Sequence, residues 1–208
     1  ALGYPDGLIA VGGDLSPERL IAAYRRGIFP WFNDDQPILW WSPDPRAVFE
    51  PDNFHMSRSL IRKLKQGGWE YSVNHCFDEV VTGCALNRGE YGTWITPEMI
   101  TAYTRLHELG YVHSIESWYQ GELAGGIYGI RLGNMFFGES MFSIKKDASK
   151  VAMFHLCTEI KPFLVDAQVY SRHLETLGAE VIDRQDFVDI IKIHADKHLT
   201  IPLTRHSG

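Results

Sequence analysis

A short apolar run that contains a single carboxylate, residues 136–143 (FFGESMFS), places the strongest constraint on the fold. Because it follows a turn at Gly133 and Asn134, the run is typical of a buried strand. An ionised Glu139 inside such a strand must be paired, hydrogen-bonded or neutralised, because an isolated buried charge is costly. Glycine at 138 lets another backbone or a ligand approach closely. Glu139 is therefore either a satisfied core residue or the polar group of an apolar pocket.

The segments on either side of this run predict an α+β fold. Three consecutive antiparallel strands are expected at 111–119, 122–131 and 135–143, joined by turns at 120–121 and 133–134. Capping and periodicity predict helices at 16–27, 57–66, 76–85, 97–110, 147–161, 171–177 and 184–195, with further strands at 71–74, 163–169 and 180–182. This order predicts a mainly antiparallel sheet with helices packed on it.

An aromatic segment near the start divides the chain. Trp31, Trp40 and Trp41 lie within a stretch whose prolines prevent a long helix. The rings form either a hydrophobic seam between domains or a stacking platform for a base. A chain of 208 residues suits one large domain with a small appendage. We therefore expect a small N-terminal domain at 1–48 and a larger domain at 49–208.

Composition argues against several classes of protein. No run approaches the roughly 18 apolar residues of a membrane span, and the start lacks a leader pattern. The three cysteines have no zinc-site spacing, which predicts reduced thiols in the cytoplasm. The nine histidines form no HExxH pattern, so no metal is expected. A net charge of −6 argues against unspecific nucleic-acid coating but permits a local basic patch.

The expected helix at 57–66 offers one such patch. Arg58, Arg62 and Lys65 recur at helical spacing, on a different face from the apolar residues. The pattern fits either a solvated charged face or a row of contacts to phosphates.

Asp166 and Gln168 are a second polar feature of a predicted strand. Being two residues apart, their side chains are expected on the same face. A buried carboxylate and amide are costly unless they bond each other or a ligand, although they could also mark a polar strand end. Together with Glu139 they place three polar groups among apolar walls, which is the usual composition of a ligand pocket.

A set of motifs spread from about residue 5 to 180 carries a resemblance to a known family. They are VGGDL at 11–15, GIFPWF at 27–32, LWWSPDPR at 39–46, GTWIT at 92–96, RLHELG at 105–110, HSIE at 113–116, GGIYG at 125–129, FGESMFS at 137–143, ASK at 148–150 and DAQ at 166–168. The chain resembles the bacterial leucyl/phenylalanyl-tRNA–protein transferases. Some members have Cys where Ala167 stands, which rules out an essential thiol there.

The resemblance implies a small N-terminal domain and a GNAT-like acyltransferase domain with a mainly antiparallel sheet. It implies transfer of Leu or Phe, and also Met, from aminoacyl-tRNA to the N-terminal α-amine of proteins that begin with Arg or Lys. The products would be marked for N-degron proteolysis. No cofactor is implied, and the implied partners are aminoacyl-tRNA and the acceptor protein.

The resemblance also assigns residues. Asp166 and Gln168 match the proposed catalytic pair of the family. The positions that match its substrate pocket are Trp31 and Trp94 for the aminoacyl-adenosine end, and Ile127, Phe136, Glu139, Met153, Leu156 and Val165 for the amino acid. The resemblance does not assign the basic residues that would hold the tRNA acceptor stem. From the charge pattern we expect them to be Arg58, Arg62, Lys65, Lys145, Lys146 and Lys150.

The chemistry of this reaction fits what the chain contains. The donor is an activated ester, so aminolysis needs no nucleotide, metal or covalent intermediate, which agrees with the missing P-loop and GxSxG motifs. An α-amine with a pKa of about 7.7–8.0 is already partly neutral at pH 7, so no strong base is required. We expect Asp166 to hold the Gln168 NH₂, and the Gln168 carbonyl to accept a hydrogen bond from the attacking amine. Glu139 is expected to bind the free amine of the donor.

Two other functions share part of this pattern. A coenzyme A-dependent N-acetyltransferase should carry a QxxGxG/A loop before a helix, and the sequence lacks one. A non-catalytic RNA-binding module would explain the aromatic residues and the basic helix, but not the carboxylate and amide at 166 and 168.

Overall fold

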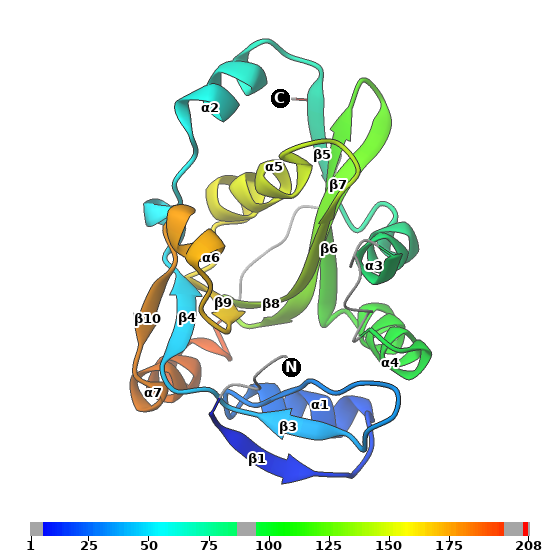
Figure 1. Cartoon of the computed structure of the whole chain (residues 1–208), viewed down its shortest axis with the longest axis vertical. Coiled ribbons are helices and arrows are strands. Elements are labelled where there is room, and N and C mark those ends of the chain that lie inside the picture. Colours follow the sequence, from blue (N-terminus) through cyan, green and yellow to red (C-terminus); the bar gives the residue numbers. More distant parts are fainter. Residues whose placement is uncertain (1–5, 87–94, 198–205, 208) are drawn as a thin grey trace.

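The computed structural model describes residues 6–86, 95–197 and 206–207. Within these residues the strands form a small sheet of order β1-β3-β2 and an eight-stranded sheet of order β10-β4-β9-β8-β7-β6-β5-β11. The small sheet and α1 lie at one end of the molecule, drawn in blue in Figure 1. None of the helices in the described part of the chain is both long and apolar enough to cross a bilayer.

The elements follow one another as β1 (Leu8–Val11), α1 (Pro17–Tyr24), β2 (Phe29–Pro30), β3 (Leu39–Trp41), β4 (Arg46–Phe49), α2 (Arg58–Lys65), β5 (Trp69–Val73), α3 (Phe77–Leu86), α4 (Pro97–Glu108), β6 (Val112–Tyr119), β7 (Glu122–Leu132), β8 (Met135–Ser143), α5 (Ala148–His155), β9 (Leu164–Gln168), α6 (Arg172–Thr176), β10 (Glu180–Ile182), α7 (Arg184–His194) and β11 (His206–Ser207). The α+β class and the mostly antiparallel sheet are confirmed. Only β8 and β9 pair in parallel among the strand pairs of the described residues.

The central meander β6-β7-β8 follows from local sequence signals. Gln120 and Gly121 both have positive φ, at 53° and 85°, as a tight hairpin turn requires. Gly125 in β7 permits close packing, because a Cβ there would lie 2.6 Å from the Phe142 carbonyl oxygen and 2.7 Å from the Ala148 Cβ. The absence of a side chain therefore lets α5 rest directly on β7, as expected for a glycine inside a strand.

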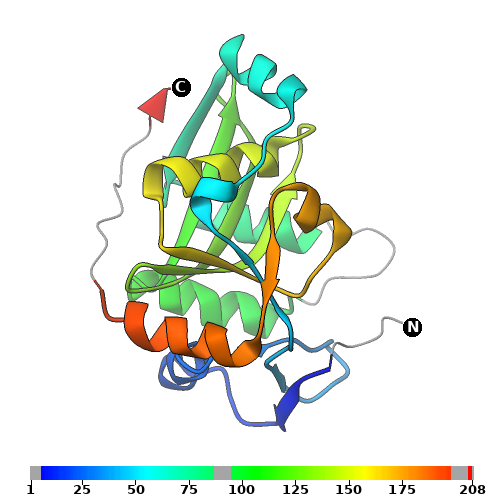
Figure 2. The ribbon, with the colours of Figure 1, turned by 90° about the vertical axis from the view of Figure 1, so that its left-hand side faces the viewer.

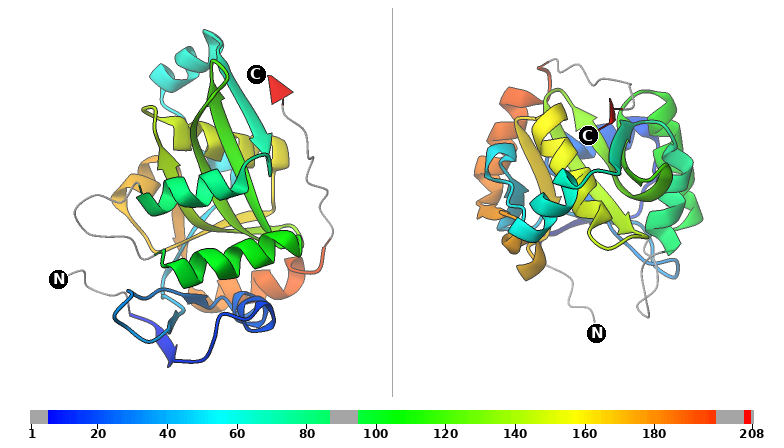
Figure 3. Two further views of the ribbon diagram at one scale, coloured as in Figure 1. Left: turned by 90° about the vertical axis from the view of Figure 1, so that its right-hand side faces the viewer. Right: turned by 90° about the horizontal axis from the view of Figure 1, so that it is seen from above.

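Helices cover both faces of the large sheet. α3 and α4 lie on one face and α5 on the other (Figures 1 and 3). α7 runs beside the N-terminal segment (Figure 2), and the Phe187 ring would lie 3.3 Å from a Cβ placed on Gly27. Helix α7 thus packs against the segment that leads into β2.

Three features differ from the sequence-based expectations or add to them. The short strand β4 was not expected, and all its residues are buried. It pairs within the large sheet with β9 and β10, although the predicted domain boundary at residue 48 falls inside it. The segment expected as one helix at 147–161 is α-helical only to His155, and Leu156–Ile160 form a π-helix. The division into two domains stays a prediction.

The parallel pairing of β8 with β9 positions the site. Phe136 is paired with Val165, and Phe137 with Asp166. Because parallel strands advance together, Glu139 and Gln168 each lie two residues beyond the same pair. Two polar residues far apart in the sequence therefore come to the same level of two adjacent strands, Glu139 in the middle of β8 and Gln168 at the end of β9.

Candidate active site

A cavity of about 390 Å³ lies between the N-terminal segment, the middle of β8 and the end of β9. Its size is within the usual range for small-molecule sites. Most of its wall is apolar. The lining residues are Phe29, Pro30, Trp31, Phe49, Ile127, Gly138, Glu139, Ser140, Met141, Met153, Val165, Asp166, Ala167, Gln168, Val169, Tyr170, Ser171 and Leu174.

The structure brings together most of the substrate-site residues predicted from the sequence. Those that line the cavity are Trp31, Ile127, Glu139, Met153, Val165, Asp166 and Gln168. Phe136 and Leu156 are buried behind this wall, in the same apolar cluster as Ile127, Met153 and Val165. Trp94 lies outside the described residues. The assigned roles of all these residues stay predictions.

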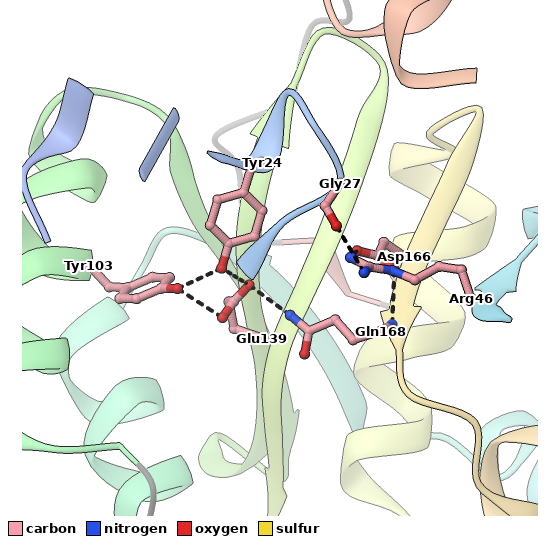
Figure 4. A network of polar contacts seen from close by, with 7 residues as sticks. All are labelled: Tyr24, Gly27, Arg46, Tyr103, Glu139, Asp166 and Gln168. Atoms are coloured by element: carbon pink, nitrogen blue, oxygen red, sulfur yellow. Dashed lines mark hydrogen bonds and ion pairs between the residues drawn. The ribbon is translucent and has the colours of Figure 1, made fainter. Parts of the chain in front are cut away.

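Glu139 is the polar centre of the cavity wall (Figure 4). The Tyr24 hydroxyl lies 2.6 Å from Glu139 Oε1, and the Tyr103 hydroxyl lies 3.0 Å from Oε2. Burial raises the pKa of Glu139 to about 7, against the opposing effect of these two hydrogen bonds. The two interpretations of Glu139 are therefore both partly right, because this carboxyl has partners and also faces a pocket.

Asp166 is held by a buried ion pair with Arg46 of β4. The guanidinium donates from Nε to Asp166 Oδ1 at 2.8 Å and from Nη2 to Oδ2 at 2.6 Å. Both side chains are almost fully buried, at 1% and 0% exposure. Arg46 Nη1 also donates to the Gly27 carbonyl at 3.0 Å. This geometry is the bidentate fork that makes Arg–carboxylate pairs strong and specific.

The expectation that Asp166 holds the Gln168 NH₂ was wrong. Gln168 Nε2 donates instead to Glu139 Oε1 at 3.1 Å, while Asp166 Oδ1 accepts the backbone N–H of Gln168 at 2.9 Å. Gln168 has a left-handed φ of 62°, so side chains no longer alternate regularly at this end of the strand. Asp166 therefore fixes the backbone of Gln168, and Glu139 fixes its amide.

The amide direction decides which atom of Gln168 is available for chemistry. Glu139 Oε1 accepts a hydrogen bond from Gln168 Nε2, and it can do so whether the carboxyl is ionised or neutral. The Gln168 carbonyl oxygen is therefore left to accept a hydrogen bond from another group. Gln168 lines the cavity, so that group can be a ligand.

The sequence-based analysis missed Tyr24, Tyr103 and Arg46. Tyr24 and Tyr103 occupy apolar positions of α1 and α4, where a buried tyrosine is usually core. Arg46 begins a strand that was not expected. Its planar group lies between two rings, 4.8 Å from the centroid of Phe29 and 4.7 Å from that of Phe187. One signal was available, because a buried Asp166 requires a cationic partner somewhere in the chain.

The predicted tRNA-binding residues come from two segments that lie against each other. Arg58, Arg62 and Lys65 are exposed on α2. Lys63 Nζ of the same helix lies 3.2 Å from Asp147, which also pairs with Lys150 at 2.8 Å. This links α2 to the start of α5. Lys145 and Lys146 are exposed there, and Lys145 Nζ lies 3.9 Å from the ring centroid of Tyr119.

Comparison with known proteins shows the family to which the chain belongs. A family model described as leucyl/phenylalanyl-tRNA protein transferase matches residues 48–192. The chain belongs to this family. The model of the family's N-terminal domain matches residues 13–44. The resemblance in the sequence is thereby confirmed, and the chain is an aminoacyltransferase of this class.

Individual members of the leucyl/phenylalanyl-tRNA–protein transferase family are similar over nearly the whole chain. The protein from Shewanella woodyi is 56% identical over 200 residues, which covers 94% of this chain and 85% of the relative. The protein from Stutzerimonas stutzeri is 50% identical and covers 95% of this chain and 89% of the relative. A GCN5-related N-acetyltransferase from Kribbella flavida aligns in three dimensions over 79% of this chain and 60% of its own, with 13% identity and a TM-score of 0.38.

Proposed function

We propose that this chain transfers Leu or Phe, and also Met, from aminoacyl-tRNA to the N-terminal α-amine of proteins that begin with Arg or Lys. The observation that carries the proposal is the cavity in which an apolar wall meets the oriented amide of Gln168. The reaction takes place in the cytoplasm and marks the acceptor for N-degron proteolysis.

The apolar part of the cavity suits the side chain of the donor amino acid. Ile127, Met153 and Val165 supply aliphatic and thioether surface without a charge. A pocket of this kind separates side chains that differ by one methylene by only about 1–3 kcal/mol. Leu, Phe and Met should therefore compete for it, whereas the β-branched Ile and Val should fit less well because of their shape.

The polar part of the cavity suits the reacting amine. In this proposal the Gln168 carbonyl oxygen accepts a hydrogen bond from the α-amine of the acceptor and aligns its lone pair on the ester carbonyl. Positioning is the larger contribution, because well-oriented reactants gain several kcal/mol in effective concentration. A proton leaves the amine nitrogen as the amide bond forms, and the departing ribose oxygen receives one.

The basic residues of α2 and α5 are proposed to hold the tRNA acceptor stem. Lys63 and Lys150 are paired with Asp147, which leaves Arg58, Arg62 and Lys65 as the exposed cations of α2 that we assign to phosphates. Such contacts release counterions and make binding salt-dependent.

Reversing Arg58 and Arg62 to Glu should flatten the salt dependence of tRNA binding. Each lost phosphate contact lowers the log–log slope by about 0.7–0.9, so the double variant should lose roughly 1.5 or more. The measurement is the tRNA dissociation constant over a series of salt concentrations. Reversal of Arg105 on α4 and Lys192 on α7, two exposed cations elsewhere, is the matched control and should leave most of the slope. Equal slopes for all proteins would reject this surface.

One assay tests the proposed reaction directly. The chain is incubated with leucyl-tRNA and a peptide that begins with Arg, and mass spectrometry should detect the peptide extended by Leu. Peptides that begin with Lys should react and peptides that begin with Gly should not. Acetyl-CoA in place of leucyl-tRNA tests the acetyltransferase alternative. An acetylated peptide, or no product with any donor, would overturn the proposal.

A further inference from the structure

Glu139 lines the cavity, and its two carboxyl oxygens contact the hydroxyls of two buried tyrosines. Tyr24 Oη lies 2.6 Å from Glu139 Oε1, Tyr103 Oη lies 3.0 Å from Glu139 Oε2, and the two hydroxyls lie 2.6 Å from each other. These are hydrogen-bond distances for O–H···O pairs. The contacts close a ring that passes through both carboxyl oxygens (Figure 4).

Each tyrosine supplies one proton to this ring, and each hydroxyl stays protonated. Burial, followed by the negative potential of Glu139, raises the pKa of both Tyr24 and Tyr103 well above the ordinary value. The N–H of Gln168 Nε2 also donates to Glu139 Oε1, but it lies outside the ring and fills none of its three contacts. Two hydroxyl protons cannot occupy three oxygen–oxygen contacts.

A proton on Glu139 completes the ring. Tyr24 then donates to Oε1, Tyr103 donates to Tyr24, and Glu139 donates from Oε2 to Tyr103. With an ionised carboxylate, one contact would place two lone pairs face to face in a buried site, which is unfavourable. The surroundings act in both directions. Burial, and to a smaller extent the nearby carboxylate of Asp166, raise the pKa of Glu139, whereas Arg46 and the two tyrosine hydroxyls, where each donates independently to a carboxylate, lower it. The closed ring differs from that case because one tyrosine donates to the other and Glu139 itself becomes a donor.

We propose that Tyr24 and Tyr103 are positioning residues that close a hydrogen-bonded ring on Glu139, hold one proton there in the empty pocket, and release it when a cationic amine binds. The amine is the α-ammonium of the aminoacyl donor, so this inference rests on the proposed function. The carboxylic acid becomes a carboxylate paired with the ammonium, and its proton passes to the solvent. Charge is conserved, since one cation enters the site and one proton leaves.

The groups around Glu139 limit where else that proton could come from. α1 supplies Tyr24, α4 supplies Tyr103, β9 supplies Asp166 and Gln168, and β4 supplies Arg46. Asp166 is already bound by the guanidinium of Arg46. Glu139 is therefore the group that can exchange a proton in this network.

Calorimetry in two buffers of different ionisation enthalpy counts the protons exchanged on binding. The probe is leucyl-adenosine linked by an amide in place of the ester, and its control is the analogue that lacks the α-amine. At pH 6, where the amine is an ammonium ion, we expect release of close to one proton for the amine probe and none for the control. At pH 9, where the carboxyl is already ionised and the amine is neutral, the sign should reverse to proton uptake.

Three variants and one control substitution make the test specific. Glu139→Gln can complete the same ring with its amide, so it should fold and bind the probe with no proton release at pH 6. In Tyr24→Phe and in Tyr103→Phe, one hydroxyl remains, and its proton fills the one remaining contact to Glu139. The carboxylate then needs no proton of its own, so the pH midpoint of proton release should fall toward the ordinary glutamate range. Tyr71→Phe, which removes the hydroxyl of another buried tyrosine whose ring stacks on His155, should leave the midpoint unchanged.

A measurement without ligand covers the case of weak probe binding. The folded pKa of Glu139 is raised above its unfolded value, so the protein gains stability below about pH 4.5 that is lost as the pH rises through about 7. His113 and His155, whose pKa values burial lowers to about 4, change stability in the opposite direction. The difference between wild type and Glu139→Gln cancels their effect and should show the decline.

Three results would overturn the inference. One is no proton release by the wild type at pH 6 in an enzyme that transfers leucine normally. Another is a rise of the midpoint in both single tyrosine variants, which would show that the hydroxyls act as independent donors to a carboxylate. The third is an equal pH dependence of stability in wild type and Glu139→Gln. Failure of the proposed function would instead appear as a wild type that transfers no amino acid.

Discussion

Replacing Arg46 with methionine is expected to lower the free energy of unfolding by about 3–5 kcal/mol. The substitution leaves the Asp166 carboxylate buried without its cation, and the Gly27 carbonyl loses a donor. An uncompensated buried charge is the largest penalty available from a single substitution at this site. Urea unfolding of the variant and the wild type at one pH measures the difference.

Two comparisons show whether the loss comes from the unpaired charge. Arg19→Met removes an exposed partner of Asp14 and should lower the stability far less than Arg46→Met, because water and salt screen an exposed ion pair. The double variant Arg46→Met with Asp166→Asn should recover part of the stability, because no buried charge remains. If Arg46→Met is as mild as Arg19→Met, or the double variant shows no recovery, the pair does not have the assigned role.

Gln168→Ala is expected to lower the turnover number by about 100-fold or more, with tRNA affinity changed little. A misplaced reactant or a lost proton acceptor each has an effect of this size. The side chain contacts Glu139 and the cavity but no residue of α2 or α5 among its hydrogen bonds, so the tRNA surface should stay intact. Single-turnover rates and tRNA dissociation constants are measured separately.

Gln168→Glu and Gln185→Ala serve as comparisons for this experiment. A glutamate at 168 keeps an acceptor oxygen but lies beside Glu139, and two adjacent carboxyls share a proton. Some activity should therefore remain. Gln185 donates to Asp189 on the exposed side of α7, and its removal should leave turnover unchanged. Equal losses of turnover and tRNA affinity in Gln168→Ala would contradict the assignment of Gln168 to the reacting amine.

Local signals in the sequence were enough to predict the central meander and most helices. Alternation and turn residues at 120–121 and 133–134 place β6, β7 and β8 within one or two residues. Capping residues placed the starts of the helices within one residue, as with Ser57, which accepts the backbone N–H of Leu60. These signals are short-range, so a single sequence contains them.

The missed features depend on contacts between distant segments. β4 is four residues long and buried throughout, so it has no alternation to detect. The direction of the Gln168 amide follows from the parallel pairing of β8 with β9, which no local pattern encodes. The apolar positions of Tyr24 and Tyr103 on their helices gave no sign that both hydroxyls meet one carboxyl.

The position of Arg46 between Phe29 and Phe187 has a consequence for protein synthesis. The cavity is lined by residues of β2 near the start of the chain and of β9 and α6 near its end. Arg46 connects these parts, because it bonds Asp166 of β9 and the Gly27 carbonyl and packs against Phe187 of α7. A nascent chain on the ribosome cannot complete the cavity lining until Leu174 has been translated, nor the packing around Arg46 until Phe187 has been translated. Incomplete translation products would therefore be unable to modify other proteins.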